Sequence, residues 1–209
     1  MRLPFRIVVW SFCGLAPLTS SRAQAAAPGS WSVGIERVFG FSTVTVKTTN
    51  KVTNQTTSNT SSQISLLDHT LSQQIGYPSA RLALDYLFPS GLSLGGAIGY
   101  QSRDPDDEVD DNDVSSWLLA PRIGYFASVT GSFGVWPRGG LSYVSVDNGG
   151  DNEASLTAIT LEVPLVLNVG GNVCFVGMPY VDLGVGGGND DFDQKATEFG
   201  LQFGLSAFF

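Results

Sequence analysis

The last eleven residues of the chain, Phe199 to Phe209, read Phe-Gly-Leu-Gln-Phe-Gly-Leu-Ser-Ala-Phe-Phe. Apolar side chains alternate with small or polar ones, which is the period-two pattern of a β-strand with one apolar face. The segment is long enough to cross the hydrocarbon core of a membrane as a tilted strand, and it ends on an aromatic residue. Its apolar positions are Phe199, Leu201, Phe203, Leu205, Ala207 and Phe209.

The same alternation occurs in most of the chain that precedes this segment. Each stretch is long enough for the roughly 9 to 11 residues that a transmembrane strand needs. The eight predicted strands are residues 30–47, 77–88, 92–102, 115–126, 132–145, 155–168, 172–186 and 196–209. The pattern predicts an all-β protein, an eight-stranded antiparallel up-and-down transmembrane β-barrel.

The predicted connections fall into two groups by length. Residues 89–91, 127–131 and 169–171 form short turns rich in turn-forming residues. The four other connections are longer and polar: 48–76, 103–114, 146–154 and 187–195. In outer-membrane barrels the short turns are periplasmic and the long loops face outward. We therefore expect both termini in the periplasm and the four long loops at the cell surface.

Aromatic residues test this orientation because they concentrate at the two membrane interfaces. On the apolar face, Phe88, Tyr125, Phe133, Phe175 and Phe209 lie at the short-turn end. Tyr100, Trp117 and Tyr143 lie at the long-loop end. Between these two girdles, the positions of the same parity are mostly aliphatic: Leu82, Leu84, Leu94, Ile98, Leu119, Ile123, Val135, Leu141, Ile159, Leu161, Val163, Leu165, Val181 and Leu183. A soluble, lipocalin-like barrel would place its apolar side chains inside instead.

The N-terminal segment has the features of a secretory signal peptide. Arg2 and Arg6 give it a charged start, residues 7–18 are apolar, and Ala23-Gln24-Ala25 is a small-x-small cleavage site. We expect residues 1–25 to be removed, which leaves residues 26–209 as the barrel domain. Cys174 is then the one cysteine of the mature chain, and its apolar surroundings predict a buried, inert thiol.

The chain is acidic, with 11 basic and 19 acidic residues and a net charge of −8. Loss of the three arginines of the signal peptide would bring this to −11. Thirteen of the acids lie in residues 104–113, 147–153 and 190–193. Such a charge argues against nucleic acid as a partner, because a phosphate backbone requires Lys and Arg.

The ionisable residues of the predicted strands fall on the inner face of the barrel. Buried charges must pair, so these residues are expected to form one network in the lumen. Two interpretations remain: a structural plug that ties opposite walls together, which we favour, or a gate in a small conduit. The residues are Glu36, Arg81, Asp85, Arg122, Arg138, Glu162, Asp182 and Glu198.

Two features do not fit regular strands. Pro121, Pro137, Pro164 and Pro179 fall within the predicted strands, where a missing N–H breaks the ladder, so bulges or different strand boundaries are expected there. Arg37 has the parity of the lipid-facing residues, where it would cost roughly 2–4 kcal/mol. We therefore expect a bulge or register change that turns Arg37 away from lipid.

Two other groups suggest chemistry only weakly. Residues 104–113 carry seven acids that could bind a divalent cation or bridge to lipopolysaccharide, but a solvated loop is the favoured interpretation. His69, the single histidine, could be imagined in a Ser-His-acid hydrolase with Asp68. Adjacent residues in an extended loop rarely reach that geometry, so no catalytic residue is assigned. No cofactor is expected, and no individual residue is assigned as a metal ligand.

The sequence resembles the small eight-stranded bacterial outer-membrane β-barrels, the superfamily of the OmpA membrane domain, OmpX and OmpW. The resemblance rests on the terminal segment, on Leu84-Asp85-Tyr86 followed by Leu92-Ser93-Leu94-Gly95-Gly96, and on Pro121-Arg122-Ile123-Gly124-Tyr125. It implies a place in the outer membrane among its lipids and lipopolysaccharide. It also implies that Phe199, Leu201, Phe203, Leu205 and Phe209 act as a signal for the barrel-insertion machinery, with periplasmic chaperones assisting.

The superfamily includes adhesins, anchors, conduits and a few lipid-modifying enzymes, so the fold does not select a function. Our preferred hypothesis is a non-enzymatic scaffold whose surface loops contact partners. The alternatives are a narrow conduit for small solutes and, less favoured, a lipid-modifying enzyme.

Overall fold

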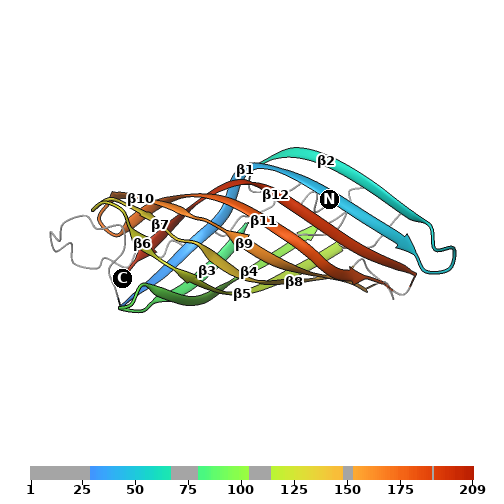
Figure 1. Ribbon diagram of the computed structural model, residues 1–209, viewed down its shortest axis with the longest axis horizontal. Coiled ribbons are helices and arrows are strands. Elements are labelled where there is room, and N and C mark those ends of the chain that lie inside the picture. Colours follow the sequence, from blue (N-terminus) through green and yellow to red (C-terminus); the bar gives the residue numbers. More distant parts are fainter. Residues whose placement is uncertain (1–28, 67–79, 104–113, 148–152, 190) are drawn as a thin grey trace, which may run out of the picture.

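The computed structural model describes residues 29–66, 80–103, 114–147, 153–189 and 191–209. They form one antiparallel sheet that closes into a barrel whose wall has eight strands (Figure 1). The predicted fold class is confirmed. The strands are β1 (Ser30–Asn50), β2 (Thr56–Leu66), β3 (Arg81–Leu87), β4 (Leu92–Arg103), β5 (Val114–Tyr125), β6 (Ala127–Ser128), β7 (Phe133–Val135), β8 (Arg138–Asp147), β9 (Glu153–Glu162), β10 (Leu165–Gly170), β11 (Val173–Gly188) and β12 (Phe192–Phe208).

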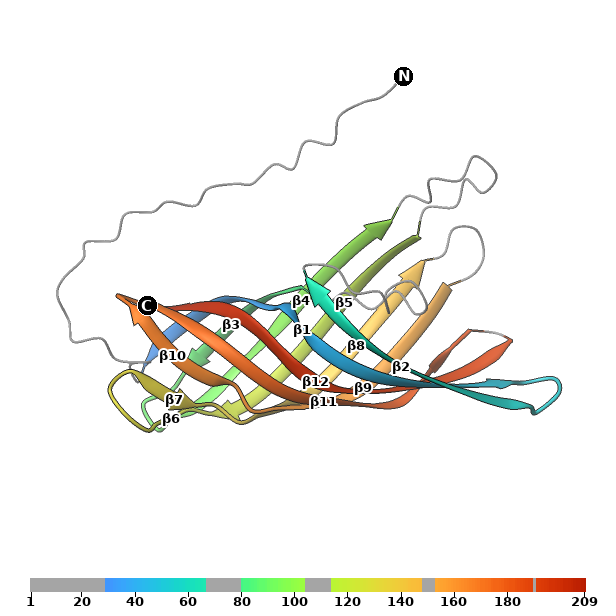
Figure 2. The ribbon, with the colours of Figure 1, turned by 90° about the horizontal axis from the view of Figure 1, so that it is seen from above.

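The first and last strands close the barrel. β12 pairs with β1 along nearly its whole length and with β11 on its other side. At the C-terminus, Trp31 and Phe209 exchange two backbone hydrogen bonds of 3.0 and 2.9 Å. The C-terminus lies at the same end as β6, β7 and β10, and the β1–β2 and β11–β12 hairpins form the opposite end (Figures 1 and 2). No helix in the described segments is long and apolar enough to cross a membrane.

Three wall strands are interrupted near the C-terminal end. β5 continues as β6 after Phe126, β7 continues as β8 after Trp136 and Pro137, and β9 continues as β10 after Val163 and Pro164. The pairing register is the same on both sides of each interruption, so these are gaps in a ladder and not bulges. Of the two expected alternatives, the structure shows different strand boundaries at Pro137 and Pro164 and no bulge, because proline removes a hydrogen bond without shifting the strand.

Pro121 and Pro179 lie inside β5 and β11 without any change of register. Pro121 is the partner of Gly96 on β4, and Pro179 is the partner of Leu201 on β12. On its other side Pro179 still accepts a hydrogen bond, from the Val163 amide at 3.0 Å. A proline can therefore occupy a closed barrel where its carbonyl keeps a partner.

Arg37 sits in a β-bulge of β1. Between the pairs Ile35–Leu205 and Phe39–Phe203, three residues of β1 lie opposite the single residue Gly204 of β12. Arg37 has a φ of 55°, in the left-handed region that non-glycine residues rarely adopt. The extra residues turn Glu36 and Arg37 inward together, and both are buried. The predicted turn of Arg37 away from lipid is confirmed.

Part of the predicted loop 48–76 is a strand. β2 pairs with the outer half of β1 from Phe39 to Thr49, beyond the stretch of β1 that pairs with β3. The segment is rich in Thr, Ser and Asn, so its sequence indicated a polar loop. The structure shows the reason for strand pairing: Thr and Ser hydroxyls bond across the two strands, as in Thr43–Ser62 at 2.8 Å and Thr45–Thr60 at 2.9 Å.

The lipid-facing parity of the wall is as predicted. Most of the predicted aliphatic positions are exposed; for example Leu94 and Ile123 are 59% and 60% exposed, and only Val135 and Val181 of the set are half-buried. At the loop end, Trp117 lies beside Tyr143 with ring centroids 5.4 Å apart. Polar residues follow immediately above: Ser115 on β5, Thr43 on β1 and Thr197 on β12. The apolar belt therefore has a defined edge on the side of the β1–β2 hairpin, which we call its upper edge.

Residues 1–28 lie outside the described part of the chain, so the signal peptide stays a prediction. The same holds for His69 and for the acidic run 104–113.

Candidate functional site

The barrel interior holds a cluster of charges, and the strand registers bring these charges together. Glu36 is the cross-strand partner of Arg81, Arg138 of Glu162, and Asp182 of Glu198. All eight predicted lumen residues are buried, and the bulge adds Arg37 as a ninth. We call these nine residues the ion cluster.

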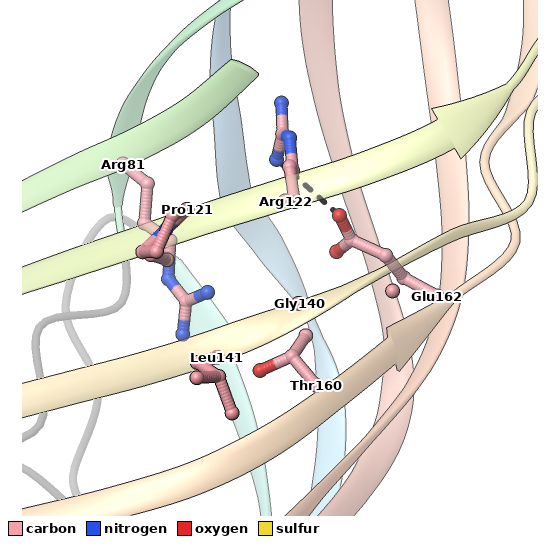
Figure 3. A pocket seen from close by; sticks show the side chains of 9 residues that line it. Arg81, Pro121, Arg122, Gly140, Leu141, Thr160 and Glu162 are labelled. Atoms are coloured by element: carbon pink, nitrogen blue, oxygen red, sulfur yellow. Dashed lines mark hydrogen bonds and ion pairs between the residues drawn. The ribbon is translucent and has the colours of Figure 1, made fainter. Parts of the chain in front are cut away.

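Arg122 is the centre of the ion cluster. Its guanidinium donates to Glu36 at 2.6 and 3.0 Å and to Asp85 at 2.9 and 2.5 Å. It also reaches Glu162 at 3.3 Å, as the dashed line in Figure 3 marks. These acids come from β1, β3 and β9, so one side chain links distant parts of the wall. Bidentate contacts of this kind are the strongest ion pairs that Arg makes.

Two further arginines extend the ion cluster toward the other strands. Arg138 contacts Glu36 and Glu162, each at 2.8 Å, and its guanidinium lies over the Trp136 ring. Arg37 donates to Asp182 at 2.7 and 3.3 Å and lies 3.8 Å from the centre of the Tyr180 ring.

The remaining members lie at the edge of the cluster. Arg81 approaches Asp182 at 3.8 Å, and the Tyr180 hydroxyl donates to Glu198. Asp182 and Glu198 face each other as like charges, so their neighbours Arg37, Arg81 and Tyr180 are what permit both to be buried.

Two glycines make room for these side chains. Gly95 and Gly140 flank Arg122 on the neighbouring strands β4 and β8. A side chain at Gly95 would meet the Asp85 carboxylate, and one at Gly140 would meet Cβ of Arg122 at 2.9 Å. In a narrow barrel, the large guanidinium groups require small residues beside them.

The ion cluster is bounded by two apolar clusters. Toward the C-terminal end lies what we call the aromatic plug, formed by Leu87, Phe126, Trp136, Val166, Cys174, Val176 and Phe208. Toward the other end a second apolar cluster consists of Ala83, Ala97, Leu118, Ala120, Val144, Val146, Leu156 and Ala196. The sequence analysis placed the ionisable residues on the inner face but predicted neither apolar cluster. The signal was available in the same parity rule, since Trp136 and Leu118 share parity with Arg138 and Arg122.

The aromatic plug is well packed. The Trp136 side chain is 1% exposed, and its indole N–H donates to Ser93 Oγ at 2.8 Å. Phe126 and Phe208 lie against it with centroids 6.1 and 6.0 Å away. Cys174 is fully buried in the same cluster, as its sequence context predicted.

A small pocket lies between β5 and β8, beside the point where their pairing is interrupted. Pro121, Gly139, Gly140 and Leu141 line it from the wall, and Arg81, Arg122, Thr160 and Glu162 line it from the interior (Figure 3). The β5–β8 pairing lapses at Ala120 and Pro121, where the proline cannot donate. The space is large enough for about one water molecule.

The described residues hold no group of three or more His, Cys, Asp or Glu side chains arranged for a metal ion. Asp193, in the predicted acidic loop 187–195, instead pairs with Lys51 at 3.4 Å. Cation binding at residues 104–113 stays a prediction, because that run lies outside the described residues.

A closed wall of eight antiparallel strands, an apolar outer belt with aromatic girdles and a polar, charged interior define an outer-membrane β-barrel. Among solved structures, the chain is similar to the outer membrane protein OprG from Pseudomonas aeruginosa, with a TM-score of 0.53 and 11% identity. That match covers 89% of this chain and 99% of OprG. The likeness establishes the fold.

Two other solved barrels are similar at lower scores. Neisserial surface protein A matches with a TM-score of 0.48 and 11% identity over 87% of this chain and 99% of its own. The outer membrane protease OmpT from Escherichia coli matches with a TM-score of 0.43 and 10% identity over 87% and 97%. No protein-family model matches the sequence, and comparison with curated proteins finds no match.

Proposed function

We propose that this protein is a non-enzymatic scaffold of the outer membrane, with a barrel closed to solutes and an outer end that contacts partners. One observation carries the proposal: the lumen is filled in layers, with the buried ion cluster between two apolar clusters. A conduit needs a hydrated path, whereas Trp136, Phe126 and Phe208 pack against one another across the lumen. The ion cluster then acts as a structural plug that ties the walls together.

Planar-bilayer recording tests the closed lumen. We expect no single-channel steps from the wild-type protein and none from Arg122→Gln. Trp136→Ala tests whether the aromatic plug closes the lumen, because it removes the largest side chain of that cluster. Steps in the wild type that change in size with Arg122→Gln or Glu162→Gln would contradict the proposal.

That result would establish the second candidate, a narrow conduit gated by the ion cluster. The pocket beside Arg81, Arg122 and Glu162 is the observation that favours it, because it brings solvent-sized space to the charges.

We further propose the orientation that the loop lengths suggest, with both termini in the periplasm and the β1–β2 end at the cell surface. Val52, 83% exposed at the tip of the β1–β2 hairpin, and Ser132, exposed in a short turn, allow a direct test. In intact cells, a membrane-impermeant maleimide should label Val52→Cys and leave Ser132→Cys unlabelled until the cells are permeabilised. Native Cys174 is fully buried and should not interfere. The reverse labelling pattern would invert the orientation.

The terminal strand is proposed as the signal for the insertion machinery, reached with the help of periplasmic chaperones. Phe209 ends the chain 63% exposed, and Phe199 and Leu205 are exposed on the same face. Phe209→Ser should slow membrane assembly in cells, measured as the fraction with heat-modifiable migration on gels. Ala207→Ser, on the same face of the same strand, is the control. Equal assembly of both variants would remove the signal role of Phe209.

A lipid-modifying enzyme is the remaining alternative. It predicts altered lipid A in cells that express the protein, with the change lost in His69→Ala. Unchanged lipid A on mass spectrometry would exclude it.

A further inference from the structure

The lysines of this chain are confined to one place. The sequence has three, Lys47, Lys51 and Lys195, and all lie on β1, β12 or the turn between β1 and β2. Of the eight arginines, three belong to residues 1–25, four are buried in the ion cluster, and Arg103 ends β4. An acidic protein therefore presents its lysines as a group at the β1–β2 end.

Two of these lysines lie side by side on neighbouring strands. Lys47 and Lys195 are direct cross-strand partners on β1 and β12, and both side chains are exposed on the outer face. Like charges directly opposite one another destabilise a sheet. Among the described residues neither is in an ion pair, whereas Lys51 contacts Asp193 at 3.4 Å and donates to the Asn189 carbonyl at 2.7 Å. Within the described segments, neither lysine of the pair therefore has an ion pair like that of Lys51.

The lysine pair stands at a defined height above the apolar belt. On β12 the last apolar outward residue is Phe199, four residues below Lys195, with Thr197 between them. Four residues of strand span about 13 Å. Because strands in such barrels tilt by roughly 40°, the vertical rise is about 10 Å. Flexible lysine side chains can bend toward the membrane, so both ammonium groups reach the headgroup level.

Hydroxyl groups lie beside the lysine pair and below it, while Asp193, opposite Thr49, is the next residue of the same face beyond Lys195. Ser58 lies opposite Lys47 on β2, and Thr45, one same-face position below Lys47, lies opposite both Thr60 and Thr197. A phosphate offers oxygens that accept hydrogen bonds both from ammonium groups and from hydroxyls. The hydroxyl face continues past the lysines as Thr49 and Thr56, whose side chains bond at 2.9 Å. This polar face suits a headgroup that carries sugar as well as phosphate.

We propose that Lys47 and Lys195, with the hydroxyls of Thr45, Ser58 and Thr197, bind the phosphate of a phosphoglycolipid of the lipid A type. The site lies on the outside of the barrel, so the lipid reaches it laterally from the outer leaflet. This inference rests on the proposed orientation, which places the β1–β2 end at the cell surface. It does not depend on whether the lumen conducts.

The test is a titration of the purified protein with bisphosphorylated lipid A in detergent micelles, read by native mass spectrometry. The double variant Lys47→Gln/Lys195→Gln should bind at least about tenfold more weakly, because each lysine near an anionic surface contributes to affinity. Lys51→Gln is the matched control: it removes an exposed lysine of the same hairpin, and binding should stay within about twofold. The double variant Lys47→Arg/Lys195→Arg, which keeps both positive charges, should retain binding. Heat-modifiable migration confirms that each variant is folded.

The lipid arms separate the possible sources of phosphate. Dephosphorylated lipid A should bind as weakly to the wild type as intact lipid A binds to the Gln double variant. Inorganic phosphate at millimolar concentration should not compete. Phosphatidylglycerol should bind more weakly than lipid A; equal, lysine-dependent binding would overturn the choice of a glycolipid. Equal lipid A binding by the wild type and the Gln double variant would overturn the site itself, whatever the conductance and labelling experiments show.

Discussion

Inside the barrel, Arg122 lies within 3.3 Å of three carboxylates, and on the outer face Lys47 lies opposite Lys195. In the interior, an unpaired charge would cost several kcal/mol, so every arginine there has carboxylates beside it. On the exposed face, water screens the repulsion between two lysines, and a like-charged pair costs little. Burial therefore distinguishes charges that hold the fold together from charges that are available to a ligand.

The sharpest test of this difference is Arg122→Met. It leaves Glu36, Asp85 and Glu162 buried without their common partner, and we expect a loss of about 3–5 kcal/mol in the free energy of unfolding. Urea titration of the protein folded in lipid vesicles measures it, with heat-modifiable migration as the readout. Lys47→Met on the outer face should change the same quantity by less than about 0.5 kcal/mol.

The origin of that loss can be checked with a second change. If stranded carboxylates cause it, Arg122→Met combined with Glu36→Gln and Asp85→Asn should recover most of the stability, since the buried charges are then removed with their partner. No recovery would mean that Arg122 stabilises the fold through packing and not through its ion pairs. The proposed energetic difference between interior and exterior charges would then fail.

A second prediction concerns the edge of the apolar belt. Leu119 and Ser115 lie on the same face of β5, below and above Trp117. Leu119→Arg places a charge in hydrocarbon and should cost about 2–4 kcal/mol, whereas Ser115→Arg at the interface should cost about 0–1 kcal/mol. The same urea titration measures both. Equal costs would show that the belt does not end at Trp117.

Much of the fold followed from period-two alternation, because a membrane outside and a packed lumen inside act on every wall residue. The same physics placed the charges of β3, β5, β8, β9, β11 and β12 on the inner face. The turn of Arg37 away from lipid was also predictable, because an arginine exposed to lipid is so costly that a bulge or register change is expected there. What the sequence could not specify was the bulge geometry, in which Glu36 and Arg37 turn inward together.

Two other features were beyond the sequence interpretation for different reasons. β2 has no apolar alternation, because most of its residues pair with the part of β1 beyond the apolar belt. Its pairing depends on hydroxyls, and although Thr favours strands, the Ser and Asn residues among the threonines favour a loop. The partners within the ion cluster depend on register and on rotamers across the lumen. Glu36 is the ladder neighbour of Arg81, yet its carboxylate forms ion pairs with Arg122 at 2.6 Å and with Arg138 at 2.8 Å.

The smallest expected effect lies in the hydroxyl ladder between β1 and β2. Thr45→Val keeps the shape of the side chain and removes its hydrogen bond to Thr60, 2.9 Å away. Because Thr60 is exposed, water replaces the lost partner, and the cost should be at most about 0.5–1 kcal/mol. Faster amide exchange in β2, followed by mass spectrometry, would report it, while exchange in β8 stays unchanged. The double variant Thr45→Val/Thr60→Val should cost no more than the single one, since no partner is left behind. A loss comparable to that of Arg122→Met would mean that the outer hairpin is as integral to the fold as the ion cluster, and the contrast between the two regions would fail.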